Sequence, residues 1–237
     1  MAIGGNEDKR VARASILSAF VSRAGGANAR IVIIPSASVE PAARAQRYTQ
    51  LFTRLGATDV RTVHAELGVT NDEREAIRNA TGIFVTGGDQ VRLMAFLRAA
   101  DCVDAIREAV RDGAVYAGTS AGASALSERM IAHSVRKRGV DHVAFDEGLG
   151  LIPNAIIDQH FGQRRRLSRL IHAANAHHLT GIGIDENTAI VWNRDGIVTV
   201  EGAGEVTIVD PDHRLTDTHA RSYRLQILRP GAKFVAD

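Results

Sequence analysis

Ala114-Val-Tyr-Ala-Gly-Thr-Ser-Ala-Gly122 is the stretch that indicates the fold of this 237-residue chain. Its first part, Ala114–Gly118, is typical of a buried strand, and a helix is expected from about Ala121. Gly118–Gly122 between them matches G-x-S-x-G, a tight strand-to-helix turn that projects the serine hydroxyl from the edge of a sheet. The backbone N–H of Ala121 is then suited to help hold an oxyanion. A glycine-rich turn without chemistry is the competing interpretation.

Strand and helix patterns alternate through the first half of the chain. Helical spacing of apolar residues marks 10–23 and 41–55, and Thr70 or Asn71 is a suitable cap for a short helix to Asn79. Between them lie short apolar runs that are typical of buried strands: Arg30–Pro35, Asp59–His64 and Gly82–Thr86. This alternation predicts a parallel sheet that right-handed crossovers cover with helices on both faces.

The second half of the chain has a different pattern. Residues 182–209 are strand-rich, and Asn193-Arg-Asp-Gly196 predicts the turn of a hairpin. No repeat, low-complexity tract or linker divides the sequence. We therefore predict a single α/β domain over residues 1–237, with a parallel-core sheet flanked by helices and a strand-rich C-terminal extension. In such sheets the chemistry lies beyond the carboxyl ends of the strands.

Composition bounds the class of protein. The chain is 45% apolar and 24% charged, and 29 Lys+Arg against 27 Asp+Glu give a formal charge of +2. This excludes a disordered chain and is too balanced for an obligate nucleic-acid binder. Cys102, the only cysteine, is expected to be a buried apolar residue, so no disulfide is implied. Without a signal-like segment or an apolar run of about 20 residues, we expect a cytoplasmic protein with no membrane partner.

A second glycine-rich turn, Gly87-Gly88-Asp89-Gln90, follows the strand expected at 82–86. Parallel strands end at one edge of a sheet, so this turn is expected near Ser120. A diglycine lets a backbone N–H, here that of Gly88, approach a developing oxyanion closely. Taken alone, the segment is more typical of an ordinary strand ending; two such turns together favour a functional site.

A third block, Ile156–Leu170, begins as an apolar strand that delivers Asp158, Gln159 and His160. A helix is expected to follow, with Leu167, Leu170, Ile171 and Ala174 on its buried stripe. Its first turn carries several arginines where the macrodipole favours acidic residues, which indicates a site rather than a structural need. These arginines suit bidentate binding of substrate carboxylates, and they are Arg164, Arg165, Arg166 and Arg169.

A fourth strand pattern, Gly181–Ile184, ends in Asp185-Glu186-Asn187-Thr188. A carboxylate from Asp185 or Glu186 would orient the imidazole of His160 and support its positive charge, and Asp158 is a further candidate for that role. The other histidines are expected to be structural. No pair among them has a convincing zinc spacing, so no metal site is predicted.

Together these blocks resemble the serine peptidase family that contains the cyanophycinases and the aspartyl dipeptidases (peptidase E), with the cyanophycinases as the nearer match. The blocks occur in order through most of the chain and are jointly specific: Gly4-Gly5, Gly87–Gln90, Gly118–Ser124, Asp158–Phe161 with its arginines, and Gly183–Thr188. Arg165 departs from the pattern, because a small residue, often glycine, is expected between two arginines. The resemblance implies a fold like that of class I glutamine amidotransferases, with serine in place of their cysteine nucleophile.

The resemblance implies that Ser120 is the nucleophile, His160 the base and Glu186 the orienting acid, with no metal or organic cofactor. It implies an oxyanion hole at Gly88 and Ala121. The implied substrate pocket is lined by Gln90, Asp158, Gln159, Arg164, Arg166 and Arg169. The implied reaction is exopeptidase cleavage of cyanophycin, a poly-aspartate backbone with arginine on each side-chain carboxylate, to release β-Asp-Arg dipeptides. A homodimer is also implied.

Three alternatives stay open. The first is an aspartyl dipeptidase or isoaspartyl peptidase-like hydrolase of the same family, with the same serine chemistry and a smaller pocket. The second is an α/β-hydrolase, whose order Ser…Asp/Glu…His would use Asp185 with His213 or His219. The third is a non-catalytic module that binds anions or nucleic acid through the arginines. The charge of +2 and the aromatic content of 5% weigh against that module.

Overall fold

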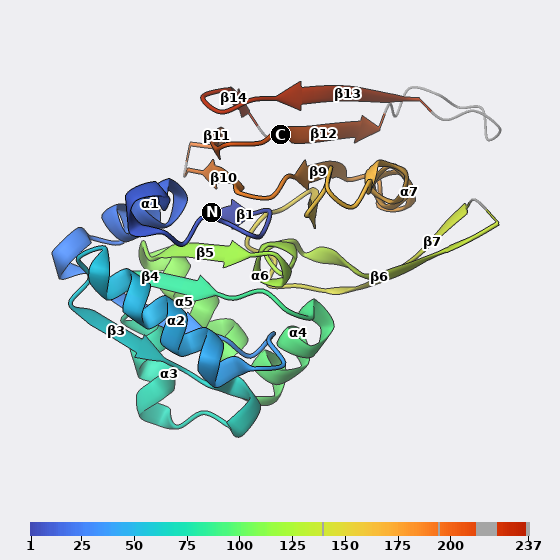
Figure 1. Ribbon diagram of the computed structural model, residues 1–237. Helices are drawn as coiled ribbons and strands as arrows, with labels where there is room; N and C mark the ends of the chain where they lie inside the picture. Colours follow the sequence, from blue (N-terminus) through green and yellow to red (C-terminus); the bar gives the residue numbers. More distant parts are fainter. Residues whose placement is uncertain (139, 194, 212–221, 236–237) are drawn as a thin grey trace. The chain divides into compact units, whose positions relative to one another are not determined.

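The computed structural model describes residues 1–138, 140–193, 195–211 and 222–235. Its contacts divide the chain into two compact units. The first comprises Met1–Ala2 and Glu7–Ala123, and the second comprises Ile3–Asn6 and Ser124–Asp237. The short strand β1 (Ala2–Ile3) spans a boundary between them. In Figure 1 most of the first unit is coloured blue to green, and most of the second green-yellow to red.

Four parallel strands form the sheet of the first unit, in the order β5-β4-β2-β3. The chain passes from β2 outward to β3 and then returns to the other side of β2 for β4, so its crossovers fall on both faces. All four residues of β4 are buried, as in a strand covered on both faces. The strands are β2 (Arg30–Ile34), β3 (Asp59–Thr62), β4 (Gly82–Val85) and β5 (Val115–Thr119).

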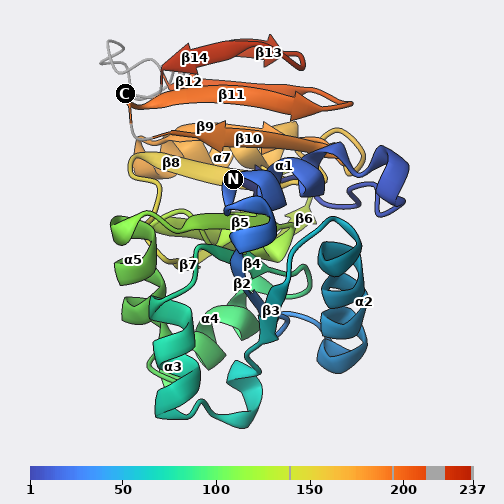
Figure 2. The ribbon, with the colours of Figure 1, turned by 90° about the vertical axis from the view of Figure 1, so that its left-hand side faces the viewer.

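Helices cover both faces of these strands, which confirms the predicted α/β core (Figure 2). The first pair along the chain packs on one face and the other three on the opposite face. They are α1 (Ser15–Arg23), α2 (Pro41–Arg54), α3 (Asn71–Arg78), α4 (Gln90–Ala99) and α5 (Cys102–Asp112), with 3-10 turns at Val11–Arg13, Gly26–Asn28 and Ala65–Leu67.

Local signals place the helices of the first unit. Thr70 caps α3 through a reciprocal capping box with Glu73, as the sequence suggested for Thr70. Cys102 is buried at the start of α5, which confirms that expectation. An aromatic group joins α2 to the sheet: the ring of Tyr48 lies 4.6 Å from that of Phe84, and the ring of Phe52 lies 5.0 Å from the same ring. These contacts fix α2 against β4.

The second unit is rich in strands, as predicted for the C-terminal part. One sheet has the order β13-β12-β9-β8, a second ladder the order β14-β11-β10, and β6-β7 is a separate hairpin. Only β8 and β9 run parallel among the pairs described in this unit. The elements are β6 (Arg129–Lys137), β7 (Val140–Glu147), β8 (Ala155–Gln159), β9 (Thr180–Ile184), β10 (Thr188–Trp192), β11 (Ile197–Gly202), β12 (Val206–Pro211), β13 (Tyr223–Leu228), β14 (Lys233–Val235) and α7 (Leu167–His177). The short helix α6 (Ala121–Ser124) begins in the first unit and ends at the first residue of this stretch of the second.

The predicted hairpin at Asn193 is confirmed, because β10 and β11 pair antiparallel and the Asn193 N–H donates to the Ile197 carbonyl at 3.0 Å. Arg194 in this turn lies outside the described residues. The long hairpin of β6 and β7 has no counterpart in the sequence prediction. Buried, half-buried and exposed residues are mixed along β6, and no long apolar run marks it, so its sequence is not typical of a strand.

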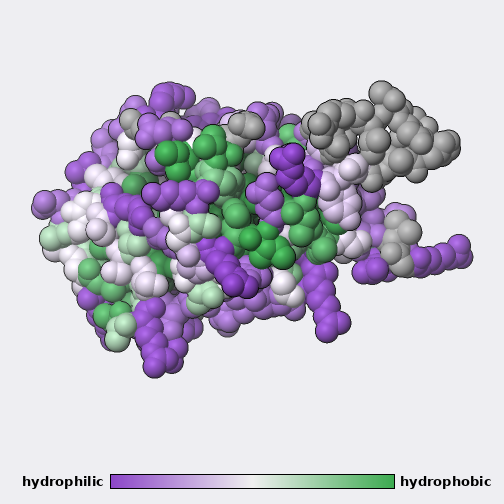
Figure 3. Space-filling view, turned by 90° about the horizontal axis from the view of Figure 1, so that it is seen from above, coloured by the Kyte–Doolittle hydropathy of each residue, from purple (hydrophilic) through white to green (hydrophobic). Residues whose placement is uncertain are grey.

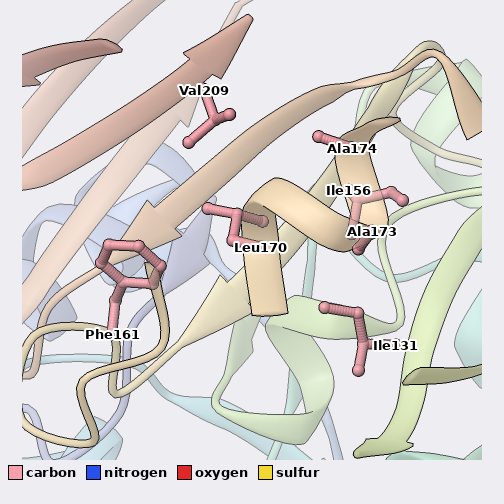
Figure 4. Packing of buried hydrophobic residues seen from close by; sticks show 7 residues of the cluster. All are labelled: Ile131, Ile156, Phe161, Leu170, Ala173, Ala174 and Val209. Atoms are coloured by element: carbon pink, nitrogen blue, oxygen red, sulfur yellow. The ribbon is translucent and has the colours of Figure 1, made fainter. Parts of the chain in front are cut away.

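Helix α7 buries one face in an apolar cluster (Figure 4). Leu170 and Ala174 are fully buried there, and Ile171 is partly buried, as expected. The expectation for Leu167 is wrong: it is 40% exposed, because it is the first residue of the helix and lies outside the apolar cluster that buries Leu170 and Ala174. Phe161 joins the cluster and anchors the segment that follows β8. The cluster consists of Ile131, Ile156, Phe161, Leu170, Ala173, Ala174 and Val209.

Hydrophobic residues lie among the hydrophilic ones on the face that Figure 3 shows. On β13, the last strand of its sheet's order, Tyr223, Leu225 and Ile227 are 42%, 40% and 56% exposed. These alternate residues lie on one side of the strand. Within the described ranges, no helix has the length and apolar character needed to cross a membrane.

Candidate functional site

Ser120 stands directly after β5, in a strand-to-helix turn within the first unit. Its φ is +52°, a sparsely populated conformation for a residue with a side chain. Gly118 packs so closely on the turn that a Cβ atom there would lie 2.1 Å from the Gly122 carbonyl oxygen. Tyr116 spans the turn as well, because its hydroxyl donates to that carbonyl at 2.9 Å. The motif therefore forms the sharp elbow that its sequence predicts.

The diglycine turn lies beside this elbow. A Cβ atom on Gly87 would lie 3.1 Å from the Cβ of Ser120 and 3.6 Å from its Oγ. Gly88 comes next, and Asp89 caps the following helix by accepting the Arg92 N–H at 2.8 Å. Gln90 is the first residue of that helix, α4. The two glycine-rich turns thus meet at the carboxyl end of the sheet, as expected.

His160 lies just after β8 in the second unit, also at a positive φ of +48°. Its Nδ1 is 2.7 Å from Oε1 of Glu186, and Asn6 donates from Nδ2 to the other carboxylate oxygen at 2.9 Å. Glu186 is therefore the acid that contacts the imidazole. Asp185 has different partners: its oxygens accept the backbone N–H groups of Gly162 at 2.8 Å and Glu205 at 3.3 Å.

Backbone contacts hold the imidazole in place from the N-terminal segment Ile3–Asn6. The His160 N–H donates to the Gly4 carbonyl at 2.8 Å, and the Asn187 N–H donates to the Gly5 carbonyl at the same distance. A Cβ atom on Gly5 would lie 2.4 Å from His160 Cε1, so only glycine leaves room for the ring. With φ at +99°, Gly5 also has a conformation that favours glycine. The Gly4-Gly5 block thus packs against the imidazole.

Electrostatics set the protonation of this pair. Burial lowers the pKa of His160, Glu186 opposes that change, and the positive charges of Arg164 and Arg166 lower the pKa further. The pKa of Glu186 lies below its usual value, chiefly because Asn6 donates to the carboxylate and then because His160 does. A neutral imidazole beside an ionised carboxylate is the arrangement that a general base needs at neutral pH.

Asp158 is the centre of a buried ion cluster in the second unit. Its side chain is 1% exposed and those of Arg166 and Arg169 are 13% exposed. Arg169 binds both carboxylate oxygens, through Nε at 2.6 Å and through Nη2, and Arg166 Nη1 lies 3.2 Å from Oδ1. Arg169 Nη1 also donates to Ser134 Oγ at 3.1 Å. One carboxylate faces two guanidinium groups, so the cluster carries a net positive charge.

The remaining predicted residues differ in exposure. Gln159 is buried, and its side-chain oxygen accepts from Arg166 Nη1 at 3.1 Å. Burial is the main reason that the pKa of Arg166 falls to about 10, a value at which it is still charged at neutral pH. Arg164 and Arg165 are exposed, in the turn before α7. Arg165, the departure from the family pattern, has a φ of +52°, which explains why glycine is common at such a position.

The structure therefore groups the predicted residues by unit. The first unit holds Ser120, Ala121, Gly88 and Gln90, and the second unit holds His160 and Glu186 with the residues around Asp158. His213 and His219, which the α/β-hydrolase alternative requires, lie outside the described residues. In the part of the chain that the structure describes, no three His, Cys, Asp or Glu side chains are arranged to hold a metal ion.

Two site residues were missed from the sequence, Asn6 and Ser134. Asn6 contacts the proposed acid, and Ser134, on β6, contacts Arg169. Asn6 directly follows the Gly4-Gly5 block, so a polar side chain after a diglycine could have indicated a site residue there. Ser134 has no such signal, because it is a common polar residue on an unpredicted hairpin.

Comparison with known proteins agrees with the motifs. A family model described as "Peptidase family S51" matches residues 1–200. A cyanophycinase of Trichormus variabilis is 42% identical, with 99% of this chain and 84% of the relative aligned. A cyanophycinase of Geminocystis herdmanii is 39% identical, with 99% and 92% aligned. A probable alpha-aspartyl dipeptidase of Drosophila melanogaster is 31% identical, but over only 50% of this chain and 52% of its own.

Solved structures agree on the fold. A peptidase from an acI-B1 Actinobacterium superimposes with a TM-score of 0.69 and 24% identity, covering 99% of this chain and 95% of that one. A putative peptidase E protein from Listeria monocytogenes gives a TM-score of 0.60 and 17% identity, with 84% and 96% covered. Since the family model and full-length relatives agree, the chain belongs to peptidase family S51, a family of serine-type peptidases.

Proposed function

We propose that this peptidase is a cyanophycinase, which cleaves the poly-aspartate backbone of cyanophycin and releases β-Asp-Arg dipeptides. One observation carries the proposal: relatives named cyanophycinase are 39–42% identical along 99% of the chain. The elbow at Ser120 and the His160–Glu186 pair supply residue types that such a hydrolysis needs.

The proposed reaction has Ser120 as nucleophile and His160 as base. Because Glu186 contacts Nδ1, Nε2 is the nitrogen that would take the hydroxyl proton as Oγ bonds to the substrate carbonyl carbon. The N–H groups of Gly88 and Ala121 would hold the oxyanion. The same Nε2 proton then passes to the leaving amine as the C–N bond breaks. Water hydrolyses the acyl-enzyme with His160 again as base.

The charges of the second unit support an acidic peptide as the substrate. We propose that the cluster of Asp158, Arg166 and Arg169, with its net positive charge, binds an aspartate carboxylate of the substrate. The exposed Arg164 would add a second positive group, while Gln90 and Gln159 would offer amides to the backbone. The substrate pocket would thus select anionic peptide backbone through several groups rather than one.

Incubation of the purified protein with insoluble cyanophycin tests the proposal, with soluble products identified by mass. We expect β-Asp-Arg from the wild type and a loss of at least about 10⁴-fold in Ser120→Ala. His160→Ala should lose a similar amount, whereas His172→Ala, a matched change on α7, should keep near wild-type activity. Near wild-type release by Ser120→Ala would contradict the proposal.

An aspartyl dipeptidase is the second candidate, supported by the 31% identity to the Drosophila protein over half of the chain. The two candidates differ in the size of substrate that they accept. Assays with Asp-Leu and with cyanophycin at equal enzyme concentration separate them. Faster turnover of Asp-Leu than of cyanophycin, at saturating amounts of both, would favour the dipeptidase.

We further propose that the protein acts in the cytoplasm as a homodimer, as the family resemblance suggests. Light scattering after size exclusion should give twice the chain mass of 25.4 kDa at assay concentrations. A mass of one chain under those conditions would contradict the dimer.

A further inference from the structure

A buried carboxylate, that of Glu7, lies behind the elbow in the first unit. The Glu7 side chain is only 1% exposed. Its Oε2 accepts a hydrogen bond from Thr119 Oγ1 at 2.6 Å, and its Oε1 accepts one from the Tyr48 hydroxyl. Lys9 Nζ lies 3.0 Å from the same Oε1 and also 5.5 Å from the centroid of the Tyr48 ring. Both carboxylate oxygens therefore have partners.

These contacts keep the carboxylate ionised despite its burial. Burial alone would raise the pKa of Glu7, but the charge of Lys9 and the hydroxyls of Thr119 and Tyr48 together hold it below its usual value. Tyr48 is itself immobilised, because it is 2% exposed and its ring packs against Phe84 of β4. Glu7 is thus a fixed charge attached to the aromatic core of the unit.

Thr119 links this fixed charge to the proposed nucleophile. It is the last residue of β5 and is 3% exposed, and Ser120 follows with its φ of +52°. The hydrogen bond to a fixed acceptor restricts the Thr119 side chain to one χ1 rotamer, and through that side chain it ties the end of the strand to the Glu7 carboxylate. A residue in a sparsely populated conformation persists only where its surroundings hold it there.

We infer that Glu7 is a positioning residue for Ser120, acting through the hydroxyl of Thr119. This inference rests on the proposed role of Ser120 as nucleophile. An ordinary packing role would be met as well by apolar residues of the same volume, since buried ion pairs contribute little net stability. What the carboxylate supplies is a directional acceptor: its geometry fixes the orientation of the Thr119 hydroxyl and with it the start of the elbow.

Variants of Thr119 isolate this hydrogen bond. Thr119→Val replaces the hydroxyl by a methyl group of equal volume, while Thr119→Ser keeps the hydroxyl. Thr81→Val is the matched control, because the Thr81 hydroxyl is also hydrogen-bonded in this unit but lies before β4 begins; it accepts the Arg30 N–H at 2.9 Å, whereas the Thr119 hydroxyl donates to Glu7. Glu7→Gln removes the charge and, since an amide nitrogen accepts no hydrogen bond, one of the two acceptors.

The primary readout is the rate at which a fluorophosphonate labels Ser120, which needs no substrate, with kcat and KM on cyanophycin beside it. We expect Thr119→Val to lower the labelling rate and kcat by about tenfold to hundredfold with KM within about twofold. Thr119→Ser should stay within about threefold of the wild type, and Thr81→Val should label at the wild-type rate whatever stability it loses. The double variant Glu7→Gln/Thr119→Val should label at nearly the same rate as Glu7→Gln alone, because both changes remove the same interaction.

The outcomes separate the inference from the proposed function. Normal labelling of the wild type without hydrolysis of cyanophycin would overturn the proposed substrate and leave the labelling comparison intact. Absence of labelling in the folded wild type would overturn both. Wild-type labelling by Thr119→Val, or equal losses in Thr119→Val and Thr119→Ser, would overturn the inference for Glu7 alone.

Discussion

The elbow at Ser120 and the turn at His160 both hold a residue at positive φ, +52° and +48°, but different forces hold them. Around Ser120 the constraint is mostly backbone packing, with Gly118 against the Gly122 carbonyl and Gly87 against the serine itself. Around His160 the constraint includes charge, because Glu186 and Asn6 bind the ring and its acid, and Asp158 lies two residues upstream between two arginines.

This difference decides how each region responds to substitution. Tight backbone packing has no space for a larger side chain, but a substitution there leaves no charge without a partner. Such a substitution should therefore shift the turn locally. A buried ion cluster has room for isosteric replacements but fails when one partner loses its charge, because the others then remain buried and unpaired.

Asp158→Asn should have the largest effect on stability. The change keeps the shape of the side chain but leaves Arg166 and Arg169 without their counter-charge, both at 13% exposure. Breaking a buried ion pair in this way costs about 3–5 kcal/mol. Urea unfolding at neutral pH measures the free energy of unfolding directly.

Asp104→Asn is the matched control, because Asp104 is 81% exposed and its Arg107 partner lies 3.4 Å away. An exposed pair of this kind adds little stability, so this variant should unfold at the wild-type urea concentration. Equal stability losses in the two variants would show that burial does not distinguish the cluster around Asp158.

Gly118→Ala should have a smaller effect on stability but a clear one on reactivity. The added Cβ would lie 2.1 Å from a backbone oxygen, which must shift, and overpacking of this kind costs about 1–3 kcal/mol. Because the oxygen belongs to the elbow, the rate of fluorophosphonate labelling of Ser120 should fall about a hundredfold.

Gly181→Ala provides the comparison, since the atoms nearest to its added Cβ would belong to side chains, those of Leu170 at 2.9 Å and Val209 at 3.3 Å. It should lose some stability and keep most of the labelling rate. If both alanine variants slow the labelling equally, backbone packing at the elbow is not what orients Ser120.

The same contrast explains what the sequence could predict. The elbow and the diglycine turn depend on small residues next to one another in the chain, so Gly118–Gly122 and Gly87-Gly88 were recognisable as patterns. The contacts of Glu186 with Asn6 and of Glu7 with Thr119 join residues more than a hundred positions apart. No periodicity or spacing records such contacts. Leu167 was misplaced for a related reason: where α7 begins depends on the turn before it, not on apolar spacing.

Asn6→Gly should have a moderate effect confined to activity. It removes the amide that donates to Glu186 Oε2 at 2.9 Å, and glycine accepts the backbone φ of +48° without strain. Loss of one hydrogen bond to a carboxylate, worth about 1 kcal/mol for an exposed donor, should lower kcat on cyanophycin about threefold to tenfold.

Asn6→Asp sharpens this test, because it keeps the preference for this backbone conformation but places a second carboxylate beside Glu186. It should lower kcat more than Asn6→Gly does. If both variants turn over at the wild-type rate, the contact of Asn6 does not support the orientation of His160.

Arg164→Gln should have the smallest effect, a shift in the pH profile. His160 acts as a base only when neutral, so kcat/KM rises as pH passes upward through its pKa. Burial first, and then the charges of Arg164 and Arg166, lower that pKa, so the wild-type acid limb should have its midpoint below the ordinary histidine value of about 6.5. Removing one positive charge raises the pKa, and the midpoint should move to higher pH. Arg165→Gln, the exposed neighbour, should move it less.

Salt separates this electrostatic cause from a change in substrate binding. Arg164 is exposed, so its effect on the imidazole should be screened, and the midpoints of wild type and Arg164→Gln should converge as the ionic strength rises from about 0.01 M to 1 M. Burial and the hydrogen bond to Glu186 are not screened in this way, so the common midpoint at high salt should reflect these two opposing contributions. If the midpoint moves to lower pH in Arg164→Gln, or if salt does not reduce the difference between the two proteins, the charge of Arg164 does not act on His160. In that case burial, and not the charge of this arginine, lowers the pKa of the imidazole.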